Sequence, residues 1–132
     1  MGQEVMVLCD TNIIIELFKG NKETISVVEK IGINDISISS ITEMELYFGA
    51  INKIELNKIK KSLRSLDVIQ IDPMISEYAV KLIEKYAKSH HLNIPDSIIA
   101  ATSLVCDIEL FTYNIKDFKY IKDLGLFNFK KK

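Results

Sequence analysis

Short apolar runs alternate with longer amphipathic stretches along the chain of 132 residues. Residues 5–9 form a continuous apolar run that stops at Asp10, which predicts a buried strand. Residues 75–87 carry the cleanest apolar stripe at helical spacing, and Asp72-Pro73 predicts where that helix begins. The other predicted strands are 36–39, 68–71, 110–112 and 126–129, and the other predicted helices are 11–19, 22–31, one from residue 40, 56–66 and 95–106.

This order of elements predicts an α/β fold in a single domain that covers residues 1–132. Short apolar strands that alternate with helices are typical of parallel sheets covered on both faces. We therefore expect three layers, with a central, mainly parallel sheet flanked by helices. Ligands of such sheets bind beyond the carboxyl ends of the strands, so functional side chains are expected there.

Composition narrows the class of protein. The chain is 48% hydrophobic, and its 17 basic and 18 acidic side chains exert no domain-wide attraction on nucleic acid. The longest apolar run, residues 97–106, is too short for a membrane span, and the N-terminus lacks the basic region of a signal peptide. We expect a cytoplasmic protein with no membrane association. Cys9 and Cys106 lack metal-binding spacing and are expected to be reduced.

Lysines near the C-terminus are one candidate for a local contact with nucleic acid. They are Lys116, Lys119, Lys122, Lys130, Lys131 and Lys132. Charge runs of this kind are more commonly a solvated face with a frayed tail, and the sequence leaves both interpretations open.

Three aspartates lie at the ends of predicted elements, where parallel sheets place their ligands. They are Asp10, Asp96 and Asp117. Each also has a structural explanation. Asp10 and Asp96 fit helix N-caps, and Asp117 fits the first turn of a short helix.

Two glutamates of the middle segment predict different roles. Ser40-x-x-Glu43 fits a capping box, which gives Glu43 a structural role at the start of a helix. Glu45 shares a helix face with Ile41 and Phe48, where an ionised carboxylate is costly unless a cation or hydrogen bonds compensate it. Function is therefore the better explanation for Glu45.

A functional interpretation places these three aspartates and Glu45 in one crevice. Their mutual repulsion would force protonation unless a divalent cation neutralised it, and an all-oxygen ligand set favours Mg²⁺ or Mn²⁺. Such an ion supports hydrolysis at a phosphoryl group. His90 and His91 end the long predicted helix and are expected at the surface rather than among the ligands. The chain has no glycine-rich phosphate loop.

Three segments resemble the signature blocks of PIN-domain proteins, most closely those of the VapC-type toxins of toxin–antitoxin modules. They are VLCDTNIIIELF, ISSITEMELYFGA and IPDSIIAATSLVCDIELFTYNIKDF. The matching positions are Asp10 and Asn12, then Thr42, Glu45, Leu46 and Gly49, then Pro95 and Asp96, and finally Thr112, Asn114, Asp117 and Phe118. Tyr113 departs from the pattern, because an arginine is common there. The blocks span nearly the whole chain, so the resemblance implies a PIN-like nuclease domain.

The resemblance also implies an activity, that of a Mg²⁺- or Mn²⁺-dependent endoribonuclease that hydrolyses RNA phosphodiester bonds. Asp10 and Asp96 would be the principal metal ligands. Glu45 would bind metal or deprotonate the attacking water, and Asp117 would complete the site directly or through water. Asn12, Thr112 and Asn114 would be the groups that position these acids and the backbone.

The same resemblance implies partners. We expect a homodimer that a small antitoxin protein neutralises by reaching into the active site. Single-stranded or loop RNA is the expected substrate, because a splayed backbone can enter a crevice. No DNA-binding segment is expected in this chain, so contact with DNA would belong to the antitoxin.

Other functions fit parts of the sequence. A non-toxin PIN ribonuclease in RNA processing would use the same acids, whereas a non-catalytic PIN module that binds RNA or protein would be expected to lack one of them. A phosphatase with an aspartyl nucleophile resembles Asp-x-Asp after the first strand, whereas this chain has Asp10-Thr11-Asn12. A purely structural α/β domain leaves Glu45 unexplained.

Overall fold

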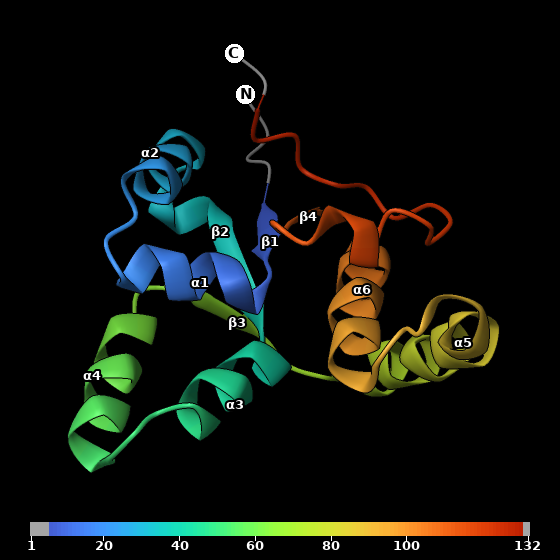
Figure 1. Ribbon diagram of the computed structural model, residues 1–132, viewed down its shortest axis with the longest axis horizontal. Coiled ribbons are helices and arrows are strands. Elements are labelled where there is room, and N and C mark those ends of the chain that lie inside the picture. The colour runs from blue at the N-terminus through green and yellow to red at the C-terminus, as the bar shows by residue number, and fades with distance from the viewer. Residues whose placement is uncertain (1–5, 131–132) are drawn as a thin grey trace.

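Strands and helices alternate along the chain in the computed structural model, which describes residues 6–130 (Figure 1). The strands are β1 (Val7–Cys9), β2 (Ile36–Ser39), β3 (Asp67–Ile69) and β4 (Glu109–Phe111). The helices are α1 (Thr11–Phe18), α2 (Lys22–Ile31), α3 (Ser40–Phe48), α4 (Lys53–Leu63), α5 (Pro73–His90) and α6 (Ile94–Cys106), with short 3₁₀ turns η1 (Ile33–Asp35) and η2 (Ile115–Asp117). No helix of this part of the chain is both long and apolar enough to cross a membrane.

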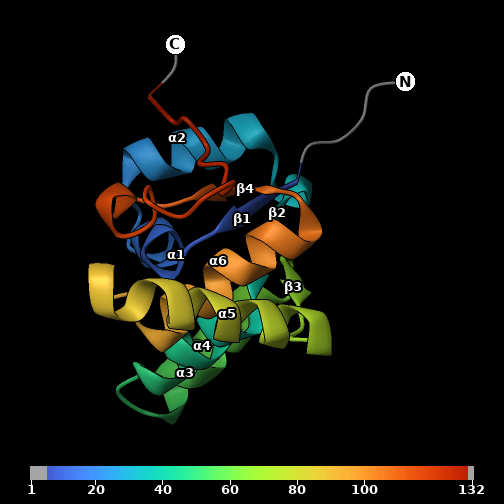
Figure 2. The same cartoon turned by 90° about the vertical axis from the view of Figure 1, so that its right-hand side faces the viewer.

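The four strands form one parallel sheet in the order β3-β2-β1-β4. Helices α1 and α2 lie on one side of it and α5 and α6 on the other (Figures 1 and 2). The predicted three-layer α/β fold is therefore confirmed. Because all four strands are parallel, their carboxyl ends meet at one edge of the sheet, which is where such folds bind their ligands.

The hydrophobic core is divided by the sheet into two halves. Leu8 of β1 packs with α5 and α6, whereas its neighbours Val7 and Cys9 pack with α1 and α2. Successive side chains of a strand point to opposite faces, so a strand covered on both sides must be apolar at every position. All three residues of β1 are 2% exposed or less, which explains the continuous apolar run in the sequence.

The last predicted strand is replaced by a single bridge. Leu126 pairs with Leu110 of β4, whose N–H donates to the Gly125 carbonyl and whose carbonyl accepts from the Phe127 N–H. Phe127 and Phe129 then pack their rings against Phe111. The apolar side chains at 126, 127 and 129 serve this packing and not a regular strand. The predicted position 5 of the first strand lies outside the described residues.

Helix α3 begins differently from the prediction. Ser39, the last residue of β2, is the N-cap, and its Oγ accepts the Ile41 N–H at 3.1 Å. Ser40 is already helical, so the predicted capping box is wrong. Glu43 instead accepts a hydrogen bond from the Tyr47 hydroxyl at 2.9 Å. The strand runs directly into the helix, which moves the cap one residue toward the N-terminus.

Candidate active site

The carboxyl ends of β1 and β4 bring the first predicted acid into the site. Asp10 follows β1 directly, and its N–H donates to the Phe111 carbonyl at the end of β4. Its carboxylate also caps α1 by accepting the Thr11 N–H at 2.8 Å. The structural and functional interpretations of Asp10 are therefore compatible, because the cap occupies Oδ1 and fixes the direction of the carboxylate.

The Asp10 carboxylate is 5% exposed and hydrogen-bonded at both oxygens. Its Oδ2 accepts from the Thr112 hydroxyl at 2.7 Å and from the Asn12 amide at 3.3 Å. Burial raises the pKa of Asp10, and the charges of Glu45 and Asp117 add to that rise. The hydrogen bonds from Thr112 and Thr11 lower it, but the net direction is upward.

Glu45 is tied to Asp10 through a threonine that follows Asp10 in the chain. The Thr11 hydroxyl donates to Glu45 Oε1 at 2.6 Å, and its oxygen lies 2.9 Å from the Thr42 hydroxyl. Thr11 can donate only one proton, so Thr42 acts as donor to Thr11 in this arrangement. The sequence prediction did not assign site roles to Thr11 and Thr42. The spacing of Thr42 and Glu45, three residues apart on one helix face, is the signal that could have found Thr42.

The predicted surroundings of Glu45 require a correction. Phe48 is 93% exposed, and the buried residues of α3 include Thr42 and Leu46. Glu45 is half-buried at the border of that face. The apolar stripe that was expected to surround Glu45 therefore does not exist, because periodicity alone does not tell which apolar side chains meet a core. Proximity to Asp10, rather than burial among apolar groups, explains the carboxylate.

Asp96 lies in the first turn of α6 and is half-buried. It is not the N-cap that the sequence allowed, because Asn93 has that role and accepts the Asp96 N–H at 2.9 Å. Burial raises the pKa of Asp96 to about 7, and the charges of three acids contribute, in the order Asp10, Asp117 and Glu45. A side-chain interaction with Asn93 counteracts part of the rise.

Asp117 ends the 3₁₀ turn η2 and is exposed. Its charge raises the pKa of both Asp10 and Asp96. The four predicted acids therefore share one electrostatic environment although they come from four separate segments of the chain. Glu45 lies next to Asp10 through Thr11, and the charges of the other acids act on Asp10 and Asp96.

Two of the three predicted positioning residues act through their side chains. Thr112 is 1% exposed, and besides donating to Asp10 it accepts the Asn114 N–H at 3.0 Å. Asn12 donates to Asp10 and accepts the Tyr113 N–H at 3.4 Å. Asn114 contributes its backbone, and its side chain makes no hydrogen bond within residues 6–130.

Tyr113, which replaces the common arginine, has a structural role. Its hydroxyl lies 2.5 Å from the Thr24 hydroxyl, and its ring packs edge-on against Phe111 and Phe129. These contacts fasten the loop after β4 to α2 and to the C-terminal segment. The loop is thereby held in place beside Asp10 without a charged side chain.

The donor atoms of the four acids are all oxygens, which suits Mg²⁺ or Mn²⁺ in type. The raised pKa values of Asp10 and Asp96 show negative charge that a cation would neutralise. No three acidic, histidine or cysteine side chains of the described part form a ready-made metal cluster. In donor type and in charge the four acids suit a divalent cation, although their side chains are not gathered tightly enough for a preformed site.

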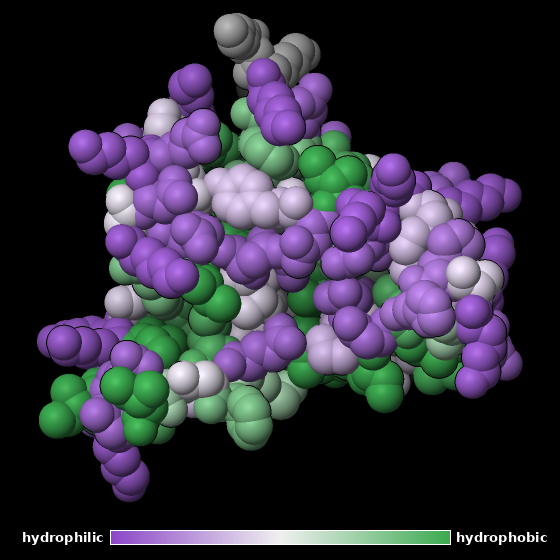
Figure 3. Space-filling model, viewed as in Figure 1, coloured by the Kyte–Doolittle hydropathy of each residue, from purple (hydrophilic) through white to green (hydrophobic). Residues whose placement is uncertain are grey.

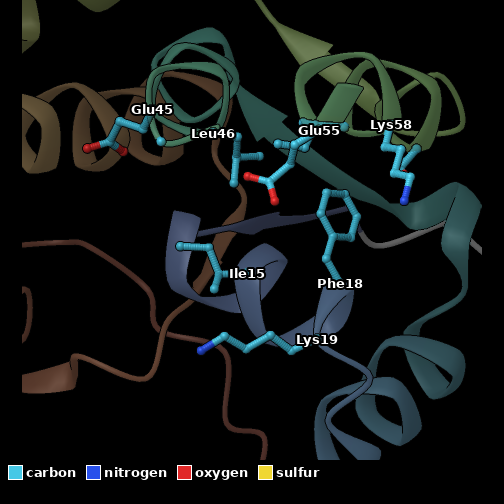
Figure 4. A pocket seen from close by; sticks show the side chains of 10 residues that line it. Ile15, Phe18, Lys19, Glu45, Leu46, Glu55 and Lys58 are labelled. Carbon is cyan, nitrogen blue, oxygen red and sulfur yellow. The ribbon is translucent and has the colours of Figure 1, made fainter. Parts of the chain in front are cut away.

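A groove of about 620 Å³ extends from Glu45 between α1, α3 and α4 (Figure 4). Ile15, Phe18 and Leu46 supply apolar side chains, and Glu55 and Lys58 line it from α4 (Figure 4). Glu45 is the one member of the acid set in its lining. Beyond the groove, hydrophobic side chains gather on the surface over the α3–α4 connection, where Phe48, Ile51 and Ile54 are 72–93% exposed (Figure 3).

A parallel sheet, with Asp10 directly after its first strand and three further acids that interact with Asp10 through their charges, defines an α/β protein with an acidic site. Residues 7–124 match the PIN domain family, and the chain belongs to that family.

Known proteins similar to this chain share most of its length. Ribonuclease VapC3 from Methanocaldococcus jannaschii is 33% identical over 70% of this chain and 92% of its own length. A toxin–antitoxin complex from Klebsiella pneumoniae contains a chain that is 34% identical, with a TM-score of 0.78 over 93% of this chain and 97% of that one. VapBC2 from Rickettsia felis, bound to a DNA fragment from its promoter, matches with a TM-score of 0.81 and 27% identity over 94% of this chain and 98% of that one.

Proposed function

We propose that this PIN-domain protein is a metal-dependent endoribonuclease and the toxin of a toxin–antitoxin pair. The observation that carries the proposal is that the charges of Glu45 and Asp117 act on both Asp10 and Asp96, and that Thr11 links Glu45 to Asp10. Relatives named ribonuclease and structures of toxin–antitoxin complexes support the choice of RNA and of a protein partner.

Asp10 and Asp96 would be the principal metal ligands, and Asp117 would complete the metal site. A Mg²⁺ or Mn²⁺ ion in such a site acidifies water and neutralises charge on a phosphoryl oxygen. Asp10 is already fixed by hydrogen bonds from Thr11, Thr112 and Asn12. It therefore presents its carboxylate in one direction whether or not the ion is bound.

Glu45 is the proposed proton acceptor for the attacking water. The water oxygen forms a bond to phosphorus, its proton passes to Glu45, the bond from phosphorus to the leaving ribose oxygen breaks, and solvent water protonates that oxygen. The Thr11 hydroxyl donates to one oxygen of Glu45, so the other oxygen is oriented toward the water. The chain contributes no histidine to this step.

The proposal is tested by incubating the protein with total RNA in chelator, in Mg²⁺ and in Mn²⁺, beside the Asp10→Asn variant. Cleavage is expected with either ion, and neither chelator-treated protein nor the variant should cleave. Undiminished cleavage in excess chelator would contradict the metal requirement. RNA binding without cleavage under any condition would favour a non-catalytic PIN module.

The partner is proposed to be a small antitoxin protein. The groove beside Glu45 offers apolar side chains flanked by Lys19, Lys58 and Glu55, which suits a protein segment with both apolar and charged residues. Expression of this chain alone should slow bacterial growth, and co-expression of a small protein encoded beside its gene should relieve it. Normal growth with active enzyme present would favour an RNA-processing role. A homodimer is also expected, and sedimentation analysis tests it.

A further inference from the structure

An aromatic pair lies beside the Asp96–Asp117 half of the site. The rings of His90, at the end of α5, and Tyr120, just after η2, are stacked with centroids 4.1 Å apart and planes 11° apart. Each belongs to a segment that leads to a site acid, since His90 precedes Asp96 by six residues and Tyr120 follows Asp117 by three. The C-terminal end of α5 and the segment after β4 lie on the side of the molecule where α1 begins (Figure 2).

The pair is held in position by a third ring. Tyr86 is buried and packs edge-on against both His90 and Tyr120, at 5.7 and 5.1 Å between centroids. The Tyr86 hydroxyl also accepts the Lys122 N–H at 3.2 Å, which fixes the turn that carries Tyr120. His90 is exposed and Tyr120 is half-buried, so a preorganised stack keeps ring surface accessible to solvent.

Both acidic and basic side chains lie near the pair. Asp96 and Asp117 lie close enough to Tyr120 for their charges to act on its hydroxyl. Lys116, Lys119 and Lys122 are exposed on the same segment, and none of them forms an ion pair within residues 6–130. Aromatic rings beside lysines are the combination by which proteins hold single-stranded nucleic acid, with bases on the rings and phosphates near the cations.

We propose that the His90–Tyr120 pair is a base-stacking platform that holds an unpaired nucleobase of single-stranded RNA next to the scissile phosphate. The platform rests on the proposed ribonuclease function and adds a substrate-positioning element to it. Double-stranded RNA would not use it, because paired bases are not available to stack on a side chain.

The test measures binding of a fluorescein-labelled single-stranded adenosine dodecamer to protein that carries Asp10→Asn, so that cleavage does not interfere. His90→Ala and Tyr120→Ala should each weaken binding about tenfold, within the range known for loss of one stacked base. His90→Phe and Tyr120→Phe retain a ring and should stay within about twofold of the parent. Tyr78→Ala removes a tyrosine of α5 outside the pair and should change nothing.

Two further measurements separate stacking from other roles. Quenching of a 2-aminopurine base in the oligonucleotide should fall in the alanine variants, whereas the slope of affinity against salt concentration should stay constant, because a ring does not replace a phosphate contact. A reduced slope in His90→Ala would overturn the proposal in favour of a phosphate contact. Unchanged affinity in His90→Ala, whose exposed side chain is not needed for the core, would overturn it outright.

The platform and the ribonuclease function fail in different ways. In the cleaving enzyme, His90→Ala should raise KM with little change in kcat, as expected when binding is lost equally in ground and transition states. Cleavage by His90→Ala with an unchanged KM would support the ribonuclease function and contradict the base-stacking platform. Base stacking by a protein that does not cleave RNA in the presence of any metal ion would support the platform and contradict the ribonuclease function.

Discussion

The two halves of the acidic site are built in different ways. Asp10 and Glu45 are held by a network of hydroxyl and amide donors from Thr11, Thr112 and Asn12. Asp96 and Asp117 lie at a helix start and in an exposed turn, and the pKa of Asp96 is raised to about 7 by burial and by the neighbouring acids. Hydrogen bonds hold one half rigid before any ion arrives, whereas the other half contains the acid whose pKa burial and neighbouring charges raise to about 7. We infer that the first half sets geometry and the second half responds to the cation.

Removing the proposed proton acceptor from the rigid half should have the largest effect. Glu45→Gln keeps an oxygen that can accept from the Thr11 hydroxyl, so the fold should be as stable as the parent or slightly more so. RNA cleavage should fall by about 10²-fold or more, as is typical when a general base is lost. Initial rates on a defined RNA and thermal melting in chelator measure the two effects.

Glu43→Gln is the matched control for this prediction, because it makes the same change one half-turn away on α3. Glu43 contacts the Tyr47 hydroxyl and not the site, so most activity should remain. If Glu43→Gln abolished cleavage and Glu45→Gln did not, the assignment of these two side chains would be wrong.

The fixed direction of Asp10 is tested by Thr112→Val, which replaces a hydroxyl by a methyl group of similar size. The variant loses the 2.7 Å hydrogen bond to the buried carboxylate, so unfolding should become easier by about 1.5–3 kcal/mol. Cleavage should fall about tenfold, the lower end of what loss of an outer hydrogen-bond partner costs. Urea unfolding and initial rates measure both.

Thr102→Val provides the comparison for that variant. Thr102 is equally buried, but its hydroxyl donates to the Ile98 carbonyl within α6. Its loss should change cleavage by less than about twofold. Equal losses of activity in the two variants would mean that general loosening of the core, and not the direction of Asp10, limits the reaction.

The sequence predicted the acids better than it predicted what holds them. Asp10 follows from the rule that parallel sheets place ligands at their carboxyl ends, because it comes directly after a predicted strand, whereas Asp96 is predicted through the resemblance to PIN-domain proteins. The Thr11 contacts to Thr42 and Glu45 join residues 31 and 34 positions apart, so they depend on how α1 approaches α3. No local pattern encodes that approach.

The errors of prediction have physical causes of the same kind. The apolar residue Phe48 is exposed because α3 and α4 extend from the body of the domain, and helical periodicity does not tell which face meets the core (Figure 1). Ser39 caps α3 because β2 ends where the helix begins, whereas Ser40 and Glu43 match the same motif by spacing alone. Asn93 rather than Asp96 caps α6, which leaves the Asp96 carboxylate available for the site.

The response of the Asp96–Asp117 half to a cation should appear as an increase of thermal stability when metal is added. Mn²⁺ that binds only the folded protein stabilises it by about 2.7 kcal/mol at 100 times its Kd, which raises Tm by several degrees. Asp96→Asn should be more stable than the parent in chelator and should gain less than half of that increase. Melting in chelator, in Mn²⁺ and in KCl of matched ionic strength measures this. Equal increases in both proteins would indicate nonspecific ion effects.

The smallest expected effect is a dependence of apo stability on pH, and it separates Asp96 from Asp10. Because the pKa of Asp96 is about 7 in the folded protein and 3.8 ordinarily, the folded state binds more protons than the unfolded state between these values. The free energy of unfolding should therefore fall as pH rises from about 4 to 7 and level off above. We expect a fall of about 1–2 kcal/mol, because solvent screens a half-buried carboxyl.

Asp96→Asn should flatten this decline, whereas Glu84→Gln, on an exposed part of α5, should keep it. The pKa of Asp10 is also raised, and its charge contributes to the raised pKa of Asp96, so Asp10→Asn should flatten the decline in part, but less than Asp96→Asn does. Chemical unfolding in chelator at four or five pH values gives these slopes. A larger flattening in Asp10→Asn would place the larger pKa rise in the half of the site that we describe as rigid.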